Sequence, residues 1–315
     1  FPALAEYLRM FYTMLTIGWL PPGSGRWNRH LVKYLRNTAA YLIRPWTACI
    51  VCVGLLLGTA AAQDAPSAAT HAQPLVWIFT GLPGDVEHLM RFSETADLIH
   101  QTLQTRFGIT KNDLRMLFGE GDWGGHEPCT RANFDDEIGR IVEATRSPDA
   151  RPIWVFFVGH ANSNDRDAFF NIGGPDPSAR ALGKALRKTR TTVPLVLWLT
   201  TAASGKFVKH LTGPGRVVVA ACADDVEDNE TEFPHVLAQA MAAPGTDANA
   251  DGFVSVLELF VAVKAGLKES YENEDLIQTE RPLLDGDGDG QATATPAQTD
   301  AAPAGNVRLT ITPNQ

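Results

Sequence analysis

Five short, nearly continuous apolar runs constrain the fold of this chain more than any other feature. They lie at residues 75–79, 114–118, 152–158, 195–199 and 217–221. A strand with one face in water alternates apolar and polar residues, whereas a strand buried on both faces reads as a continuous apolar run. The runs therefore predict strands at the centre of a protein, covered on both sides.

Helical patterns separate these runs. Apolar residues recur at helical spacing over 85–107, 134–145, 179–186 and 233–241, and 168–172 can form a short accessory strand. Strands that alternate with helices form βαβ units, which produce parallel sheets with helices on both faces. We therefore predict an α/β fold, a three-layer α/β/α sandwich with a mostly parallel central sheet.

The amino-terminal region has the order of a secretory signal peptide. In 32–62, basic residues (Arg36, Arg44) precede an apolar run over 48–57, and three alanines end at Ala62 before Gln63. This order predicts export to the periplasm or cell exterior after cleavage near Ala62–Gln63, with no stable membrane span in the mature form. The alternative is a retained membrane anchor at residues 46–62. Residues 1–31 are expected to be an untranslated or disordered extension, and 63–73 a linker.

Composition and motifs exclude two classes of ligand. The formal net charge is −9 and no basic stripe is visible, which argues against nucleic-acid binding. The first strand is followed by Gly81-Leu82-Pro83-Gly84, which lacks the glycine pattern that binds a dinucleotide. Gly286, Gly288 and Gly290 are spaced as in such a loop, but no predicted strand precedes them and aspartates separate them.

The segment Asp247–Glu258 matches the twelve-residue calcium loop of an EF-hand at every fixed position. Side-chain oxygens come from alternate residues, Gly252 permits the sharp turn, and the last carboxylate closes the site from the following helix. The predicted Ca²⁺ ligands are Asp247, Asn249, Asp251, the main-chain carbonyl of Phe253, Ser255 and Glu258. Pro244-Gly245 interrupts any helix that enters the loop.

A second acidic segment repeats part of this loop. Asp285, Asp287 and Asp289 occupy its first, third and fifth positions, but Pro296 stands where the closing carboxylate belongs. We regard these aspartates as a candidate second metal site, the alternative being a flexible acidic segment. The calcium-binding segment then spans 243–290, and 291–315 is a linker whose residues 306–311 can add a last strand.

Two strand ends carry residues suited to nucleophilic catalysis. The run 152–158 leads into Gly159-His160, and the run 195–199 leads into Ala202-Ala203-Ser204-Gly205. Neighbouring parallel strands bring their carboxyl ends into one crevice, where ligands bind. A histidine on one strand end can activate a thiol or hydroxyl on the next.

In these residues the chain resembles the caspase/legumain family of cysteine peptidases. The family pattern is an apolar strand ending in His-Gly and, about forty residues on, a strand ending in Cys-x-Ser-Gly; here they are VFFVGHA with His160 and Ala202-Ala203-Ser204-Gly205. The strand GRVVVAAC and the acidic loops also resemble bacterial members. The resemblance covers roughly residues 73–290. It implies a caspase-like domain over 74–242 and a crevice suited to a peptide or protein partner.

The chain departs from that pattern at the nucleophile. Ala202 stands where the resemblance places the catalytic cysteine, and an alanine methyl cannot attack a carbonyl. The sequence therefore favours a calcium-binding, catalytically inactive relative acting as a binding or scaffold module. One alternative is an active hydrolase in which Ser204 or Cys222 works with His160. Another is a purely structural, calcium-stabilised protein. Whether Cys129 and Cys222 form a disulfide stays open.

Overall fold

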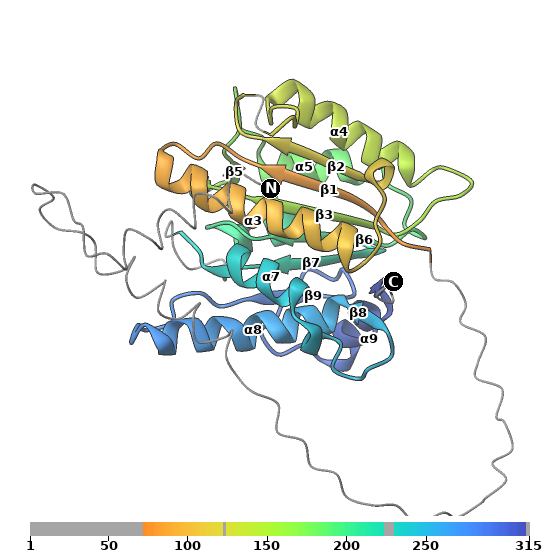
Figure 1. Cartoon of the computed structure of the whole chain (residues 1–315). Helices are drawn as coiled ribbons and strands as arrows, with labels where there is room; N and C mark the ends of the chain where they lie inside the picture. Colours follow the sequence, from red (N-terminus) through yellow and green to blue (C-terminus); the bar gives the residue numbers. More distant parts are fainter. Residues whose placement is uncertain (1–71, 122–123, 224–229, 313–315) are drawn as a thin grey trace, which may run out of the picture. The chain divides into compact units, whose positions relative to one another are not determined.

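A six-stranded sheet forms the centre of the protein in a computed structural model that describes residues 72–121, 124–223 and 230–312 (Figure 1). The strand order is β2-β1-β3-β6-β7-β9. The strands are β1 (Leu75–Thr80), β2 (Leu114–Phe118), β3 (Ile153–Val158), β6 (Leu195–Leu199), β7 (Arg216–Ala220) and β9 (Leu283–Asp285). The first five are parallel, and β9 pairs antiparallel with β7. The predicted mostly parallel α/β sheet is confirmed.

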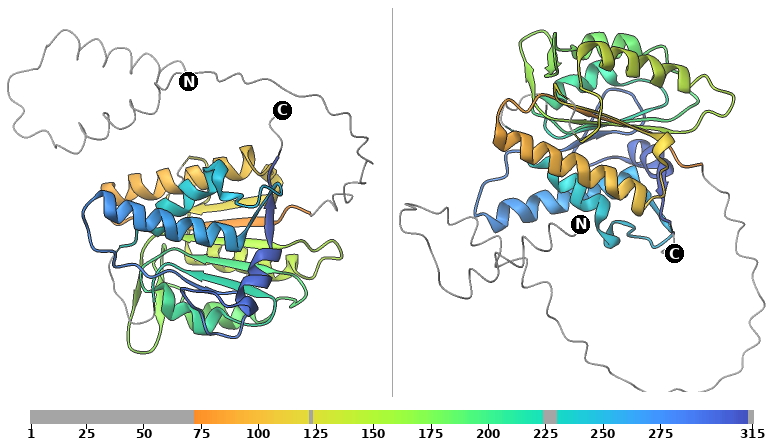
Figure 2. Two further views of the ribbon diagram at one scale, coloured as in Figure 1. Left: turned by 90° about the horizontal axis from the view of Figure 1, so that it is seen from below. Right: turned by 45° about the horizontal axis from the view of Figure 1, so that its top comes forward.

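Helices cover both faces of this sheet (Figures 1 and 2). One face carries α3 (Val86–Thr105), α7 (Phe233–Ala242) and α8 (Val256–Asn273). The other carries α4 (Arg131–Ala144), α5 (Ala179–Leu186) and α6 (Ser204–Leu211). The described part of the chain therefore has the three predicted layers.

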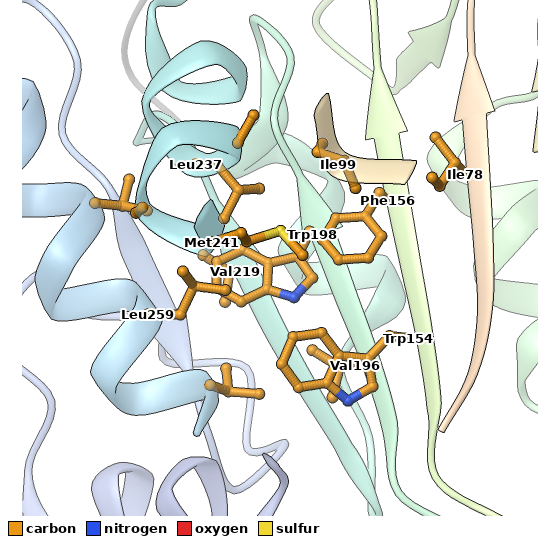
Figure 3. Close-up of a cluster of buried hydrophobic side chains, with 14 of the residues drawn as sticks. Ile78, Ile99, Trp154, Phe156, Val196, Trp198, Val219, Leu237, Met241 and Leu259 are labelled. Carbon is orange, nitrogen blue, oxygen red and sulfur yellow. The ribbon is translucent and has the colours of Figure 1, made fainter. Parts of the chain in front are cut away.

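The continuous apolar runs are explained by two separate cores. Alternate residues of a strand point to opposite faces, so Trp154 and Phe156 of β3 enter the core under α3 and α7, while Val155 and Phe157 enter the core under α4 and α5. Figure 3 shows the first core, where the rings of Phe156 and Trp198 stack with centroids 6.2 Å apart. Every residue of β3, β6 and β7 is therefore buried whichever way it points.

Smaller elements complete the fold. The hairpin of β4 (Ala161–Ser163) and β5 (Ala168–Phe170) includes the predicted accessory strand. Two 3-10 turns, Lys111–Asp113 and Pro244–Thr246, precede β2 and the acidic loop at 247–258. Because α7 ends at Ala242, Pro244-Gly245 does interrupt the entry to that loop.

The carboxyl-terminal region differs from the sequence prediction in two places. A strand, β9, does precede Gly286, although none was predicted there, because its three residues form a strand only by pairing with β7. The expected linker contains α9 (Gln298–Asn306), which buries Ala304 against the core. The predicted last strand is present as β10 (Arg308–Thr310), which pairs antiparallel with β8 (Phe253–Ser255).

The predicted extension, signal peptide and most of the linker lie outside the described residues, as does the alternative anchor at 46–62. Within the described ranges, no helix is both long and apolar enough to cross a membrane.

Candidate functional site

His160 lies at the carboxyl end of β3, held there by a tight turn. The preceding Gly159 has φ of +135°, and a Cβ atom at this position would lie 3.0 Å from the main-chain nitrogen of Gly81. Only glycine adopts this conformation and this close approach without strain. The turn brings His160 over the loop that follows β1.

The His160 ring is oriented by three groups from that loop and from α3. Its Nε2 lies 3.2 Å from the carbonyl oxygen of Pro83, and its ring packs against the rings of His88 and Phe92, with centroids 4.6 and 4.9 Å away. A carbonyl acceptor selects the tautomer with the proton on Nε2, which leaves Nδ1 as a lone-pair nitrogen. An oriented histidine with one unprotonated nitrogen is the arrangement required of a general base.

The next strand end along the sheet carries Ala202. β6 stops at Leu199, and α6 begins at Ser204 after a turn in which Ala203 has φ of +52°. A non-glycine residue in this left-handed region is uncommon and marks a strained turn. The strand, sharp turn and helix expected around a nucleophile are therefore present, with the buried methyl of Ala202 at its position.

Ser204 and Cys222 contact each other rather than His160. The Ser204 Oγ lies 3.2 Å from the Cys222 Sγ and accepts a hydrogen bond from the Cys222 main-chain N–H at 3.1 Å. Thr200 donates its hydroxyl proton to Phe157 O, and Thr201 donates to Ala202 O. Among the residues that the structure describes, none of these hydroxyls or thiols is hydrogen-bonded to the His160 ring.

We expect Ser204→Ala to destabilise the fold by about 1–2 kcal/mol, because it leaves the buried Cys222 N–H without an acceptor. Urea unfolding followed by tryptophan fluorescence measures this change. Ser147→Ala, which removes a hydroxyl from an exposed turn, serves as the matched control and should change stability by less than about 0.5 kcal/mol. Equal effects of both substitutions would contradict the structural role of Ser204.

Both cysteines of the described region are free and buried, so the structure has no Cys129–Cys222 disulfide. Burial raises the pKa of the Cys129 thiol well above its usual range, which keeps it protonated at neutral pH. Neither thiol is therefore expected to react readily in the folded protein.

Charged residues connect α3 with the start of α7 beside His160. His88 contacts Asp85 through Nδ1 at 2.8 Å and Glu230 through Nε2 at 2.6 Å, and Arg91 pairs with Glu232 at 2.6 Å. Partial burial lowers the pKa of His88, but hydrogen bonds to Asp85 and Glu230 outweigh it and raise the pKa above the usual value. The folded protein therefore favours the imidazolium form of His88.

This network predicts a pH-dependent contribution to stability. Because the folded-state pKa of His88 is raised, its stabilisation is complete below the unfolded-state value of about 6.5 and is lost as the pH rises through the folded-state value. His88 is partly exposed, so we expect only about 0.5 kcal/mol. His88→Gln should reduce the slope of the melting temperature against pH between pH 6 and 8. An unchanged slope would show that His88 does not titrate with folding.

The acidic loop at 247–258, the first of the two loops, is closed by its own side chains. Asp247 accepts hydrogen bonds from the main-chain N–H groups of Asp251 and Gly252, at 3.1 and 3.0 Å, and Gly252 has φ of +83°. The side chains of Asn249 and Asp251 each accept a hydrogen bond from the main-chain N–H of the residue two positions further along the chain. Three of the five predicted ligand side chains thus bond to the main chain of the loop, and Asp251 in addition pairs with Arg308 of β10 at 3.3 Å.

The pairing of β8 with β10 leaves the expected carbonyl ligand available. Ile311 donates to Gly252 O, and Val256 donates to Val307 O, so Gly252 and Val256 turn their main chain toward β10. Main-chain groups in an antiparallel pair alternate in direction, so Phe253 and Ser255 turn theirs away from β10. The Phe253 carbonyl therefore faces the loop, as a seventh-position ligand must.

Glu258 stands at the start of α8, where its Oε2 accepts hydrogen bonds from the N–H and hydroxyl of Ser255. The Glu258 N–H in turn donates to the Ser255 Oγ at 3.1 Å, which together with the bond from the Ser255 N–H forms a capping box. Its Oε1 is buried and has no hydrogen-bond partner. A buried carboxylate oxygen without a donor is costly, and a cation in the loop would satisfy it.

The second acidic loop repeats the hydrogen-bond pattern of the first. Asp285 accepts from the N–H groups of Gly288 and Gly290 at 2.7 and 3.0 Å, and Asp287 and Asp289 each accept from the residue two further on. One carboxylate oxygen of each of these three aspartates lies within 4.8 Å of the others. Asp247, Asp251 and Glu258 do not converge to this degree, because Glu258 turns one oxygen back onto Ser255.

Both loops lie at the amino-terminal edge of the parallel sheet, opposite His160. Asp285 pairs with Val218 in the middle of β7, and the loop after it reaches the residues before β7, since a Cβ atom at Gly288 would lie 2.2 Å from Gly213 O. The Gln73 side chain, just before β1, bonds to the main chain of Thr310 in β10, which pairs with the first loop. A metal here would stabilise the helix and strands at this edge rather than contact a ligand at His160.

No known family model and no curated protein sequence matches this chain. Among solved structures, protein GSU0716 from Geobacter sulfurreducens is similar with a TM-score of 0.46 and 13% identity, over 75% of this chain and 98% of that one. A secreted C11 cysteine protease from Bacteroides thetaiotaomicron, solved with an irreversible peptide inhibitor, is similar with a TM-score of 0.34 and 14% identity. The similarity covers 64% of this chain and 60% of that one. Caspase-1 from Spodoptera frugiperda is similar with a TM-score of 0.41 and 10% identity, over 68% of this chain and 86% of that one.

Proposed function

We propose that this protein is a calcium-binding, catalytically inactive relative of the caspase/legumain peptidases that works as a binding or scaffold module. The observation that carries the proposal is the pair of neighbouring strand ends. His160 is oriented by the Pro83 carbonyl on one of them, while the position of the nucleophile on the other is the methyl of Ala202. The second strand end thus lacks an atom that His160 could activate.

The arrangement of the loops supports calcium as the bound metal. Oxygen ligands from carboxylates, an amide and a carbonyl are the donors that Ca²⁺ prefers, and neither loop offers sulfur or imidazole. The unpartnered Oε1 of Glu258 favours the loop at 247–258, and the convergent aspartates 285, 287 and 289 favour a second site. Export of the mature chain, into compartments where calcium is abundant, is part of the proposal.

Two other functions compete with this one. An active hydrolase would need Ser204 or Cys222 to reach His160, yet these two residues are hydrogen-bonded to each other. A purely structural calcium protein would use the loops and leave the crevice without a ligand. The oriented ring of His160 favours a crevice that still holds a peptide or protein segment, and the acidic composition makes nucleic acid a poor partner.

Calorimetric titration of the EDTA-treated protein with Ca²⁺ tests the metal part of the proposal. We expect saturable binding and a rise in the melting temperature, since a ligand that binds only the folded state at 100 times its Kd adds about 2.7 kcal/mol of stability. Mg²⁺ is the control, because it requires tighter octahedral geometry and keeps its water. No heat and no thermal shift with Ca²⁺ would refute calcium binding.

A further inference from the structure

The charge of this protein is unevenly distributed. Residues 177–223 contain eight of its 27 Lys and Arg residues and none of its 36 Asp and Glu residues, although the whole chain has a formal net charge of −9. This segment includes α5 and α6, which cover the face of the sheet opposite α3 and α8 (Figure 2). A basic surface is therefore present on this face, although no basic stripe was visible in the linear sequence.

Cations follow the outer side of α5. Arg180, Lys184 and Arg187 are spaced at i, i+4 and i+7, which places them on one side of a helix. The exposed cations of α5 and the turn after it are Arg180, Lys184, Arg187, Lys188 and Arg190. They form a continuous line on the surface.

α6 adds a cation to the same surface. It lies so close to α5 that a Cβ atom at Gly183 would be 2.1 Å from the carbonyl oxygen of His210. Burial lowers the pKa of His210, and the charges of Lys209 and of two α5 arginines lower it further, against the opposing charge of Asp167. Cations of both helices thus act on one region. We call it the basic face, formed by Arg180, Lys184, Arg187, Lys188, Arg190 and Lys209.

Few acidic groups neutralise the basic face. Among the described residues, Arg180 is its one member with an ion pair, 3.8 Å from Asp167. On the neighbouring α4, Asp135 and Glu143 each pair with an arginine of their own segment. The field of the other five cations therefore extends into the solvent.

Helix ends alone do not explain these cations. Lys184 and Lys209 lie in the last turns of α5 and α6, where the helix dipole favours a positive charge. Arg180, however, lies in the first turn of α5, where the same dipole disfavours one. The alignment of the cations therefore indicates a binding role.

The basic face lacks the features of a protein or single-stranded nucleic-acid interface. The exposed large apolar side chains of the described residues all lie on other elements: Val86, Met90, Val261, Leu276 and Ile277. Protein interfaces depend on aromatic and apolar anchors, and single-stranded nucleic acid on aromatic stacking. Long cationic side chains on the outside of two adjacent helices suit a broad anionic surface instead.

We propose that the basic face binds the surface of a membrane that contains anionic phospholipids, its Lys and Arg side chains pairing with the lipid phosphates. Each cation close to such a surface adds to the binding, and the attraction falls off within a Debye length. In this orientation the acidic residues of α3 and α8 face away from the membrane. The contact requires neither calcium nor a ligand at His160, so it does not depend on the proposed function.

Vesicle sedimentation in EDTA tests the proposal, because the chelator prevents calcium from bridging protein and lipid. The full chain should bind vesicles of phosphatidylcholine with about one third phosphatidylglycerol at least about tenfold more tightly than vesicles of phosphatidylcholine alone. The second set measures any binding through the apolar run at 48–57. Raising the salt concentration from about 0.05 to about 0.3 M should reduce the difference at least about fivefold. Equal binding to both kinds of vesicle would overturn the proposal.

Substitutions locate the contact. Lys184→Gln combined with Arg187→Gln should weaken binding to the anionic vesicles at least about tenfold, and Lys209→Gln alone about fivefold. The matched control, Lys111→Gln with Lys268→Gln, removes the same charge from exposed sites on other elements and should change binding less than about twofold. All these side chains are exposed, so the melting temperature should change little.

Two results would contradict this assignment. If the Lys184 and Arg187 double variant binds as its control does, the cations serve only the helices that carry them. If poly-glutamate or duplex DNA binds the protein more tightly than the anionic vesicles do, the basic face belongs to an acidic polypeptide or nucleic acid rather than to a membrane.

Discussion

Ala202→Cys should create a thiol whose reactivity depends on His160. The residue stands in a turn that already has the expected shape, with Ala203 in the left-handed region and α6 beginning one residue later. A histidine partner lowers a cysteine pKa from about 8.5 toward neutrality or below, which raises the thiolate fraction at pH 7 about tenfold or more. The rate of iodoacetamide labelling should rise by the same factor over an unassisted thiol.

Three controls make this labelling experiment decisive. The parent protein should label slowly, because Cys129 and Cys222 are buried. Ala203→Cys places a thiol one residue further along the same turn, where the side chain is as buried as Cys222, and should label as slowly as the parent protein. Combining Ala202→Cys with His160→Gln should return the rate to that level. If the fast labelling persists when His160 is replaced, His160 does not activate the thiol at position 202 and the two strand ends do not form one site.

Glu258→Gln should weaken calcium binding at the first loop by at least about tenfold, because loss of even an outer-shell partner costs about 10–100-fold in metal affinity and Glu258 is a predicted direct ligand. Glutamine keeps an acceptor for the Ser255 N–H, so the capping box and the start of α8 should survive. The loss should therefore appear in affinity rather than in folding.

Calorimetry distinguishes the two loops in this variant. Glu269→Gln removes a carboxylate from the same helix, away from the loop, and should leave the titration unchanged. Glu258→Gln should remove one binding event and retain any event due to Asp285, Asp287 and Asp289. Unchanged affinity would mean that Glu258 only caps α8.

The sheet could be predicted from the sequence because each of its five parallel strands is buried on both faces. Trp154 and Phe156 serve one core and Phe157 the other, and such burial leaves a continuous apolar run. The sequences of β9 and α9 contain no such continuous apolar run. Leu283–Asp285 becomes a strand only beside β7, and α9 includes Pro303, which lacks an N–H for the helix. Tertiary packing decides both elements.

The candidate site was predictable only in part. The order of the strands places His160 and Ala202 on neighbouring strand ends, as their positions after apolar runs suggested. The contacts that decide their chemistry join residues far apart in the chain. Pro83 orients His160 from 77 residues away, and Cys222 engages Ser204 across 18 residues. No local motif encodes either contact.

The most direct test of catalytic inactivity is the intact mass of the unaltered protein after incubation, in Ca²⁺, with a fluorophosphonate and a peptidyl acyloxymethyl ketone. The fluorophosphonate phosphonylates an activated serine with loss of fluoride, and the ketone alkylates an activated cysteine with loss of its carboxylate. Our account predicts no adduct on Ser204 or Cys222 at any time while the protein stays folded. A stoichiometric adduct that disappears in His160→Ala would contradict it.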